Sequence, residues 1–289
     1  QRLRIRKGHN YARKALKSAV ARGDEDKSSG SPVLTGALGR IALLVRMGLL
    51  DEAEREIQAL GGRGDPNALL AIAFLADRVG AHDLSVLIMR RYLSGFVGLG
   101  LEGPGRQAWT LAYPQAFKGE LGGHCKAADV DPHLARSIMR EESGFVADIE
   151  SWANAIGLMQ LIMPTAKKMA TVGSQVAVSP ELLRDPDTNI RLGVRYLRHL
   201  QSLFAHPALI IAGYNAGEAR IETWLKDNGH LTMDLFIASI PFRQTRGYTM
   251  RVLQTWFRYQ VLYGEGGPFL DMSRARSFRR APKKKKRRR

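Results

Sequence analysis

The sequence predicts an all-α protein, and two observations support that prediction. Apolar residues recur three and four positions apart along most of the chain, as at Ile190, Val194, Leu197 and Leu200, which is the spacing of an amphipathic helix. No stretch shows the strict alternation of apolar and polar residues that a half-buried strand needs. We therefore expect an N-terminal region of helix pairs, superhelical or tetratricopeptide-like, followed by a second α-helical domain.

Composition divides the chain of 289 residues into four predicted parts. A basic N-terminal segment and linker are expected over 1–31, and a helical-repeat and linker region over 32–111. The second helical domain is expected over 112–265, and a disordered basic tail over 266–289. The chain is long enough for one large domain or two modest ones.

Two similar turns predict the helix pairs of the first region. Gly48 and Asp51 recur as Gly80 and Asp83, at an offset of 32 residues. Each glycine is expected to end a helix and each aspartate to N-cap the next one. The offset is typical of tetratricopeptide repeats, and two ordinary helical hairpins are the alternative.

The net charge of +17 is concentrated at the C-terminus. Residues 274–289 hold eleven basic residues and no acidic one, which leaves +6 for the rest of the chain. The basic tail is expected to contact an anionic polymer or lipid, or to stay solvated without a dedicated partner. No specific nucleic acid is predicted, because the body shows no interleaving of aromatic and basic residues.

Several classes of protein are excluded by composition. The single cysteine, Cys125, excludes an internal disulfide framework and a cysteine-rich zinc site, and no cofactor or metal is expected. No apolar run approaches the length of a transmembrane helix. We expect no signal peptide within the given residues, which start at Gln1 and can be a piece of a longer protein.

The most informative stretch begins with a predicted helix after residue 130. Asp131 suits the N-cap, Pro132 the first helical position and Gly144 the helix end. The apolar stripe of this helix consists of Leu134, Ala135, Ile138 and Met139. The next position on the stripe, one turn beyond Ile138, is Glu142.

Two adjacent carboxylates are therefore expected to face different surroundings. Glu142 should point toward the core, where lost hydration favours the neutral form and raises its pKa. A carboxylic acid that stays protonated near neutral pH can donate a proton to a leaving group. Glu141 lies beside Arg140 on the polar side and is expected to face water. The alternative for Glu142 is a solvent-facing side chain at a fraying helix end, or a pair with Arg140.

Motifs in a fixed order carry a resemblance to a known family. They are ES (142–143), GLMQ (157–160), GYNAG (213–217), SIPF (239–242) and TRGY (245–248), with LAYPQAF (111–117) ahead of them. This order resembles the SLT catalytic domain of soluble lytic murein transglycosylases, glycoside hydrolase family 23, over about residues 112–263. The upstream helix pairs are similar to the superhelical and linker parts of larger family members.

The resemblance implies a lysozyme-like domain that cleaves the β-1,4 bond between N-acetylmuramic acid and N-acetylglucosamine without adding water. Glu142 stands at the family's catalytic acid. By similarity it protonates the glycosidic oxygen and then accepts the proton of the muramic 6-hydroxyl, which gives a 1,6-anhydro end. The resemblance also implies a periplasmic or cell-envelope location, with peptidoglycan strands as the partner.

The resemblance further implies a set of substrate-binding positions along the glycan groove. These are Ser151, Met159, Gln160, Tyr214, Asn215, Gln244 and Tyr248. Turn or core roles are the alternative for Met159, Gln160, Asn215 and Tyr248.

The chain departs from the family pattern at four positions. Ala238 and Gln244 stand where the family usually has glutamates, Asn154 where glycine is common, and Glu141 where glutamine is common. The two missing acids put glycan and peptide binding in doubt. The alternatives are a hydrolytic muramidase with the same fold, a degenerate, non-catalytic wall-binding or scaffold protein, and a nucleic-acid binder led by the basic tail.

Overall fold

The computed structural model describes residues 36–60, 66–95, 101, 103–170, 177–264 and 270–280. Within these ranges it contains fourteen α-helices, α2 to α15, and one short 3-10 helix, η2, and the β-pairs there are isolated bridges only. The predicted all-α class is confirmed. The chain divides into two compact units, Gln1–Ala116 and Phe117–Arg289.

The first unit is built from consecutive helices that pack pairwise. Helix α2 packs on α3 and α4, α4 packs on α5 and α6, and α5 packs on α6. Their bounds are Gly36–Met47, Leu50–Ala59, Pro66–Arg78, His82–Arg91 and Gly103–Ala112 for α2 to α6. Fully buried aliphatic side chains such as Ile41, Ile57, Ile72 and Ile88 form the core.

The capping prediction for this unit is wrong at both turns. Leu49 and Ala81 are the N-cap residues of α3 and α5, and neither side chain caps its helix. Asp51 and Asp83 lie instead in the first turns, where a carboxylate favours the positive end of the helix dipole. The repeat itself stays a prediction.

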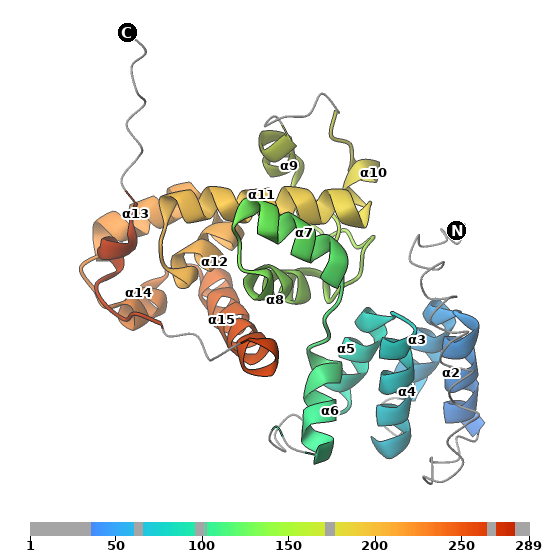
Figure 1. The fold of residues 1–289 in the computed structure, drawn as a ribbon. Helices are drawn as coiled ribbons and strands as arrows, with labels where there is room; N and C mark the ends of the chain where they lie inside the picture. The colour runs from blue at the N-terminus through green and yellow to red at the C-terminus, as the bar shows by residue number, and fades with distance from the viewer. Residues whose placement is uncertain are drawn as a thin grey trace. The chain divides into compact units, whose positions relative to one another are not determined.

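The second unit places three helices around Glu142. Helix α8 packs against α15 and α7, and α15 also packs against α12, as Figure 1 shows. Helix α11 supports this group through α7, α9 and α12. The bounds are α7 Lys118–Ala128, α8 Pro132–Ser143, α9 Met163–Ala170, α10 Pro180–Leu183, α11 Pro186–Leu203, α12 Pro207–Ala216, α13 Glu218–Asn228, α14 Met233–Ser239 and α15 Arg243–Tyr263.

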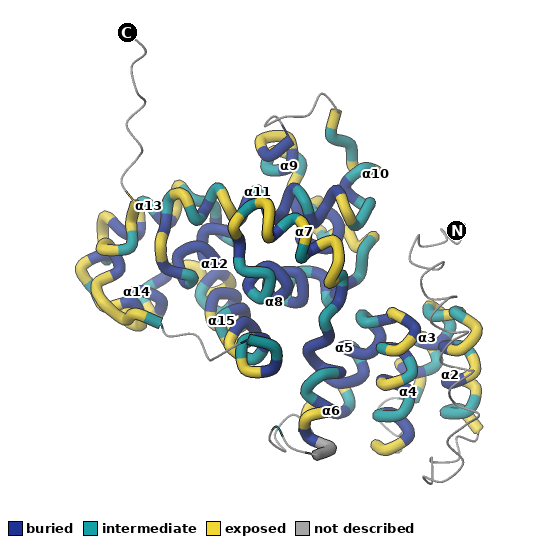
Figure 2. The backbone as a smooth tube through the Cα atoms, in the orientation of Figure 1, coloured by how far each residue is buried: buried dark blue, intermediate teal, exposed yellow. Residues whose placement is uncertain are grey.

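Burial follows this arrangement closely (Figure 2). Helices α8 and α12 are buried along most of their length, whereas α13 keeps an exposed face. Helix α12 is hydrophobic nearly all round, which is typical of a helix surrounded by other helices.

The predicted disordered tail is wrong over residues 270–280. Helix η2, Ala275–Phe278, packs on α13, and Ala275 is fully buried. The backbone N–H groups of Ala275 and Arg276 donate to the carbonyls of Leu231 and Gly229 at 2.8 and 2.9 Å. The predicted segment 1–31 lies outside the described residues, as do residues 266–269 and 281–289 of the predicted tail. Among the helices that are described, none combines the length and the hydropathy that crossing a bilayer requires.

Candidate active site

Helix α8 begins and ends where the sequence predicts. The Asp131 carboxylate accepts a hydrogen bond from the backbone N–H of His133 at 2.7 Å, and Pro132 occupies the first turn. Gly144 ends the helix in the left-handed region at φ 59°. The predicted apolar stripe is buried throughout: Leu134, Ala135, Ile138 and Met139.

Glu142 lies at the end of this stripe and is only partly exposed. Burial raises the pKa of its carboxyl group to about 7, and the negative charge of Glu141 adds to the rise. The Tyr248 hydroxyl and the positive charge of Arg251 act in the opposite direction, because both stabilise the carboxylate. Glu142 is therefore divided between its acid and base forms near neutral pH.

Glu141 does not face water, which corrects the sequence-based expectation. Its side chain is only 5% exposed and forms an ion pair with Arg140 at 2.7 Å. The Thr255 hydroxyl on α15 donates to the same carboxylate oxygen at 2.9 Å, and the Arg251 guanidinium lies 3.8 Å from the other. The polar side of α8 is covered by α15, so this carboxylate becomes a buried link between the two helices.

Two tyrosines enclose Glu142 from other helices. Tyr214 on α12 is 9% exposed, and its hydroxyl donates to the Met159 carbonyl at 2.8 Å. Tyr248 on α15 is 3% exposed. Its buried hydroxyl interacts with Glu142, although it forms no well-aligned hydrogen bond with another residue. Burial, followed by the nearby Glu142 charge, raises the pKa of both phenols well above the usual value. Both phenols therefore stay neutral beside Glu142.

The loop between α8 and α9 holds its residues in unusual backbone conformations. Gln160 has φ 47°, and its side-chain amide donates to the carbonyls of Gly157 and Ile149 at 3.0 and 3.2 Å. Asn154 has φ 57°, a left-handed conformation that glycine and asparagine tolerate best. This conformation accounts for the asparagine at a position where the family commonly has glycine.

Ser151 and Met159 contribute to the same loop in different ways. The Ser151 hydroxyl accepts a hydrogen bond from the backbone N–H of Ala155 at 3.1 Å, so it closes the turn around Asn154. Met159 is fully buried, and a side chain at Gly193 of α11 would collide with it. Only the carbonyl of Met159 is directed to Tyr214.

The last two predicted residues lie at the ends of α12 and α15. The Asn215 side-chain oxygen accepts from the Thr245 hydroxyl at 2.8 Å, which joins the two helices beside Tyr214. Gln244 is exposed in the first turn of α15. The structure thus brings Glu142, Tyr214 and Tyr248 together, and it places Ser151, Gln160 and Gln244 on surrounding segments.

Asn189 is an important residue that sequence reasoning did not single out. Its fully buried side chain donates to the carbonyls of Ile156 and Leu183 at 2.9 and 2.8 Å and accepts from the Met159 N–H at 2.8 Å. The signal available was a polar residue one position before Ile190, where the apolar stripe of α11 begins. Asn189 fixes the loop that carries Met159 and Gln160.

No side-chain group suited to hold a metal ion, meaning three or more His, Cys, Asp or Glu together, occurs in the part of the chain that the structure describes. Glu150 of the loop is paired with Arg184 instead. The groups that the structure places at and around Glu142 are its carboxyl group, two phenols and side-chain amides.

Comparison of the sequence with known proteins finds related ones. Residues 123–237 match the family model described as the transglycosylase SLT domain. A putative soluble lytic murein transglycosylase of Haemophilus influenzae is 35% identical over 167 residues, which is 56% of this chain and 28% of the relative. The soluble lytic murein transglycosylase of Escherichia coli K12 is 35% identical over 158 residues, which is 53% of this chain and 24% of the relative. The chain spans about a quarter of the length of these relatives.

Solved structures show the same fold. The 70-kDa soluble lytic transglycosylase of Escherichia coli superposes with a TM-score of 0.65 at 23% identity, covering 93% of this chain and 44% of that chain. A 70-kDa soluble lytic transglycosylase in complex with bulgecin A gives a TM-score of 0.69 at 24% identity, covering 94% and 45%. The resemblance to the soluble lytic murein transglycosylases is confirmed, with the all-α fold that it implies.

Proposed function

We propose that this chain, whose residues 123–237 match the transglycosylase SLT domain, is a peptidoglycan lytic transglycosylase. One observation carries the proposal: Glu142 is partly buried, with a pKa raised to about 7. Such a group supplies a proton near neutral pH and can accept one back in the same turnover. The bond cleaved would be the β-1,4 link from N-acetylmuramic acid to N-acetylglucosamine.

In the proposed reaction a single carboxyl group, that of Glu142, acts first as the acid and then as the base. Protonated Glu142 gives its proton to the glycosidic oxygen, and the bond from that oxygen to the muramic C1 breaks. The resulting carboxylate then takes the proton of the muramic 6-hydroxyl while O6 bonds to C1. The products are an N-acetylglucosamine 4-hydroxyl and a 1,6-anhydro muramic end, and Glu142 is again protonated.

The neighbouring carboxylate supports a mechanism with one acid. Most glycosidases use two carboxyl groups flanking the bond. Glu141 is adjacent, but its oxygens are held by Arg140 and Thr255 and its side chain is 5% exposed. Its role in the proposal is electrostatic, because its charge helps to keep Glu142 protonated.

The other predicted residues are proposed to hold the glycan around Glu142. Tyr214 and Tyr248 are neutral phenols beside the carboxyl group, and Tyr248 is assigned the closer role because it interacts with Glu142 itself. Gln160, Ser151, Asn215 and Gln244 offer amide or hydroxyl groups to sugar hydroxyl and N-acetyl groups. Met159 acts through its carbonyl, which orients Tyr214.

The location proposed for this activity is the periplasm or cell envelope, where peptidoglycan lies. The matched relatives are described as soluble lytic murein transglycosylases, which supports murein as the substrate. The missing glutamates at Ala238 and Gln244 are proposed to alter substrate preference rather than the acid itself.

Mass spectrometry of the products from purified peptidoglycan tests the proposal. A transglycosylase yields muropeptides with 1,6-anhydro ends, lighter by one water than the products of a muramidase. Hydrolysed products would replace the proposal with the hydrolytic alternative. Binding to peptidoglycan without any product would support the non-catalytic alternative.

A further inference from the structure

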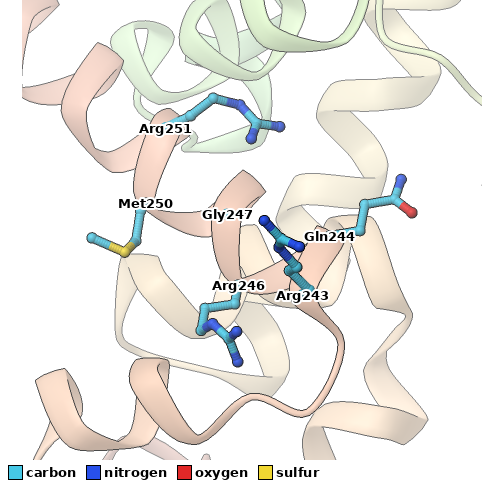
Figure 3. A pocket seen from close by; sticks show the side chains of 6 residues that line it. All are labelled: Arg243, Gln244, Arg246, Gly247, Met250 and Arg251. Carbon is cyan, nitrogen blue, oxygen red and sulfur yellow. The ribbon is translucent and has the colours of Figure 1, made fainter.

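The first turns of α15 form an open hollow of about 550 Å³ (Figure 3). The lining positions recur three and four residues apart, so they share one face of the helix. They are Arg243, Gln244, Arg246, Gly247, Met250 and Arg251. Arg246 belongs to the TRGY motif, whereas no motif accounts for Arg243 and Arg251 on the same face.

The hollow is strongly positive. Three of the six lining residues are arginines and none is acidic. Arg243 and Arg251 are exposed, and Arg246 is fixed by a hydrogen bond from its guanidinium to the Ile240 carbonyl at 2.8 Å. The N-terminus of α15 adds partial positive charge, since Phe242 at the N-cap offers no side-chain acceptor. An anion is the ligand that this surface favours.

The hollow borders the proposed active site through α15. Arg251 lies 3.8 Å from a carboxylate oxygen of Glu141, and its charge lowers the pKa of Glu142. Tyr248, which interacts with Glu142, follows Gln244 by one helical turn. A group bound here would belong to the part of the substrate next to the bond that is cleaved.

We propose that this hollow binds carboxylates of the peptide that N-acetylmuramic acid carries on its lactyl group. The inference rests on the proposed function. It names the attached peptide as the part of the substrate that makes the protein prefer peptide-bearing over peptide-free glycan strands. The sugar rings of the glycan offer hydroxyl and N-acetyl groups, whereas the attached peptide offers free carboxylates. Guanidinium groups match carboxylates in shape and can form paired hydrogen bonds with them.

Gln244 makes this hollow suited to an anion. A glutamate at this position, as the family pattern has it, would place a negative charge among the arginines and weaken their attraction for a carboxylate. The neutral amide removes that competition. Glutamine in place of glutamate at residue 244 is therefore explained as a change that favours substrates whose peptides carry free carboxylates.

Binding measurements on a Glu142→Gln protein test the inference, because they are independent of turnover. The ligands are soluble glycan strands with their peptides, the same strands after enzymatic removal of the peptides, and strands whose peptide carboxylates have been converted to amides. We expect the peptide-bearing strands to bind most tightly. The preference should disappear with the amidated strands.

Two further substitutions and a control locate the preference. Arg243→Gln and Gln244→Glu, each in the Glu142→Gln protein, should lower the ratio of affinities for peptide-bearing over peptide-free strands about two- to five-fold, as expected for exposed charges. Arg198→Gln removes an exposed arginine of α11, and should leave that ratio unchanged. Circular dichroism checks that each variant is folded.

The outcomes separate the inference from the proposed function. Equal affinity for the three kinds of strand, or an unchanged ratio in Arg243→Gln and Gln244→Glu, overturns the inference, whatever the products of the wild-type protein. Hydrolysed products, or no products, from the wild-type protein overturn the proposed function. Even then, a preference for peptide-bearing strands that is lost in Arg243→Gln and Gln244→Glu supports the binding of peptide carboxylates in the hollow.

Discussion

Two adjacent glutamates at the end of α8 have different chemical roles because different neighbours surround them. Glu141 meets Arg140 and Thr255, so its charge is compensated inside the protein. Glu142 is desolvated and faces phenols, so its neutral form is favoured. Their adjacency then couples them, because the fixed charge of one raises the pKa of the other.

Replacing Tyr248 with phenylalanine should move the alkaline limb of the pH profile to higher pH. The Tyr248 hydroxyl stabilises the Glu142 carboxylate, so its removal raises the pKa of Glu142 further. The measurement is kcat/KM on peptidoglycan as a function of pH. Tyr196→Phe is the control, since that hydroxyl donates to the Gly213 carbonyl. A limb that stays in place, or moves to lower pH, contradicts the assignment of Tyr248.

Glu142→Gln should stabilise the protein at alkaline pH. The pKa of this carboxyl is raised from 4.5 to about 7 on folding. The unfolded chain therefore ionises first, and the stability present below pH 4.5 is lost as the pH rises toward 7. A neutral glutamine removes that loss, on the order of 2–3 kcal/mol at pH 8. Thermal unfolding at pH 4 and pH 8 measures the difference, and an equal effect at both pH values contradicts it.

At the scale of the elements, polar contacts join α8 to α15. The Asp131 carboxylate, besides capping α8, accepts from Trp256 and Gln260 at 2.6 and 2.8 Å. The Glu141 carboxylate accepts from Thr255 one turn before Tyr259. These contacts fix the position of α15, and with it the position of Tyr248 beside Glu142.

Glu141→Gln should destabilise the second unit by about 3 kcal/mol, because it removes one charge of the buried ion pair between Arg140 and Glu141. Urea unfolding followed by circular dichroism measures the change. Glu222→Gln is the matched control, since Glu222 pairs with the exposed Arg279 and its loss should cost less than about 1 kcal/mol. Equal effects of the two substitutions would show that the Glu141 pair is no stronger than a surface pair.

The sequence predicted elements whose signals are local, and it missed those that depend on neighbours. Helix α8 has a capping aspartate, a proline and a terminal glycine within its own residues. Helix α7 was not predicted, because its N-cap residue Phe117 is left-handed and offers no capping side chain, and because the helix contains Gly119, Gly122 and Gly123. Its place is decided by packing on α8 and α11.

The candidate site divides in the same way. Glu142 could be predicted from the stripe of α8, since both the helix and its apolar face are local features. The burial of Glu141 could not, because it depends on α15, which lies more than a hundred residues further along the chain. The three hydrogen bonds of Asn189 likewise join segments that only the fold brings together.

At the scale of the whole molecule, the chain consists of two units with separate cores. Every predicted site residue, from Glu142 to Tyr248, belongs to the second unit, Phe117–Arg289. We therefore expect the proposed chemistry to depend mainly on the second unit.

A fragment of residues 117–289 should fold and cleave peptide-free glycan strands at a rate close to that of the full chain. Its core and its site residues lie within the fragment. Circular dichroism and product analysis at equal protein concentration test this expectation. A fragment that is folded but inactive would show that the first unit contributes to catalysis.

The most direct measurement compares the turnover and the binding of Glu142→Gln with those of the wild-type protein on peptide-free glycan strands. Glutamine keeps the shape of the side chain and cannot give up a proton. We predict a loss of turnover of at least about 10²-fold with glycan affinity retained. Turnover that survives the substitution would contradict the assignment of Glu142 as the proton donor.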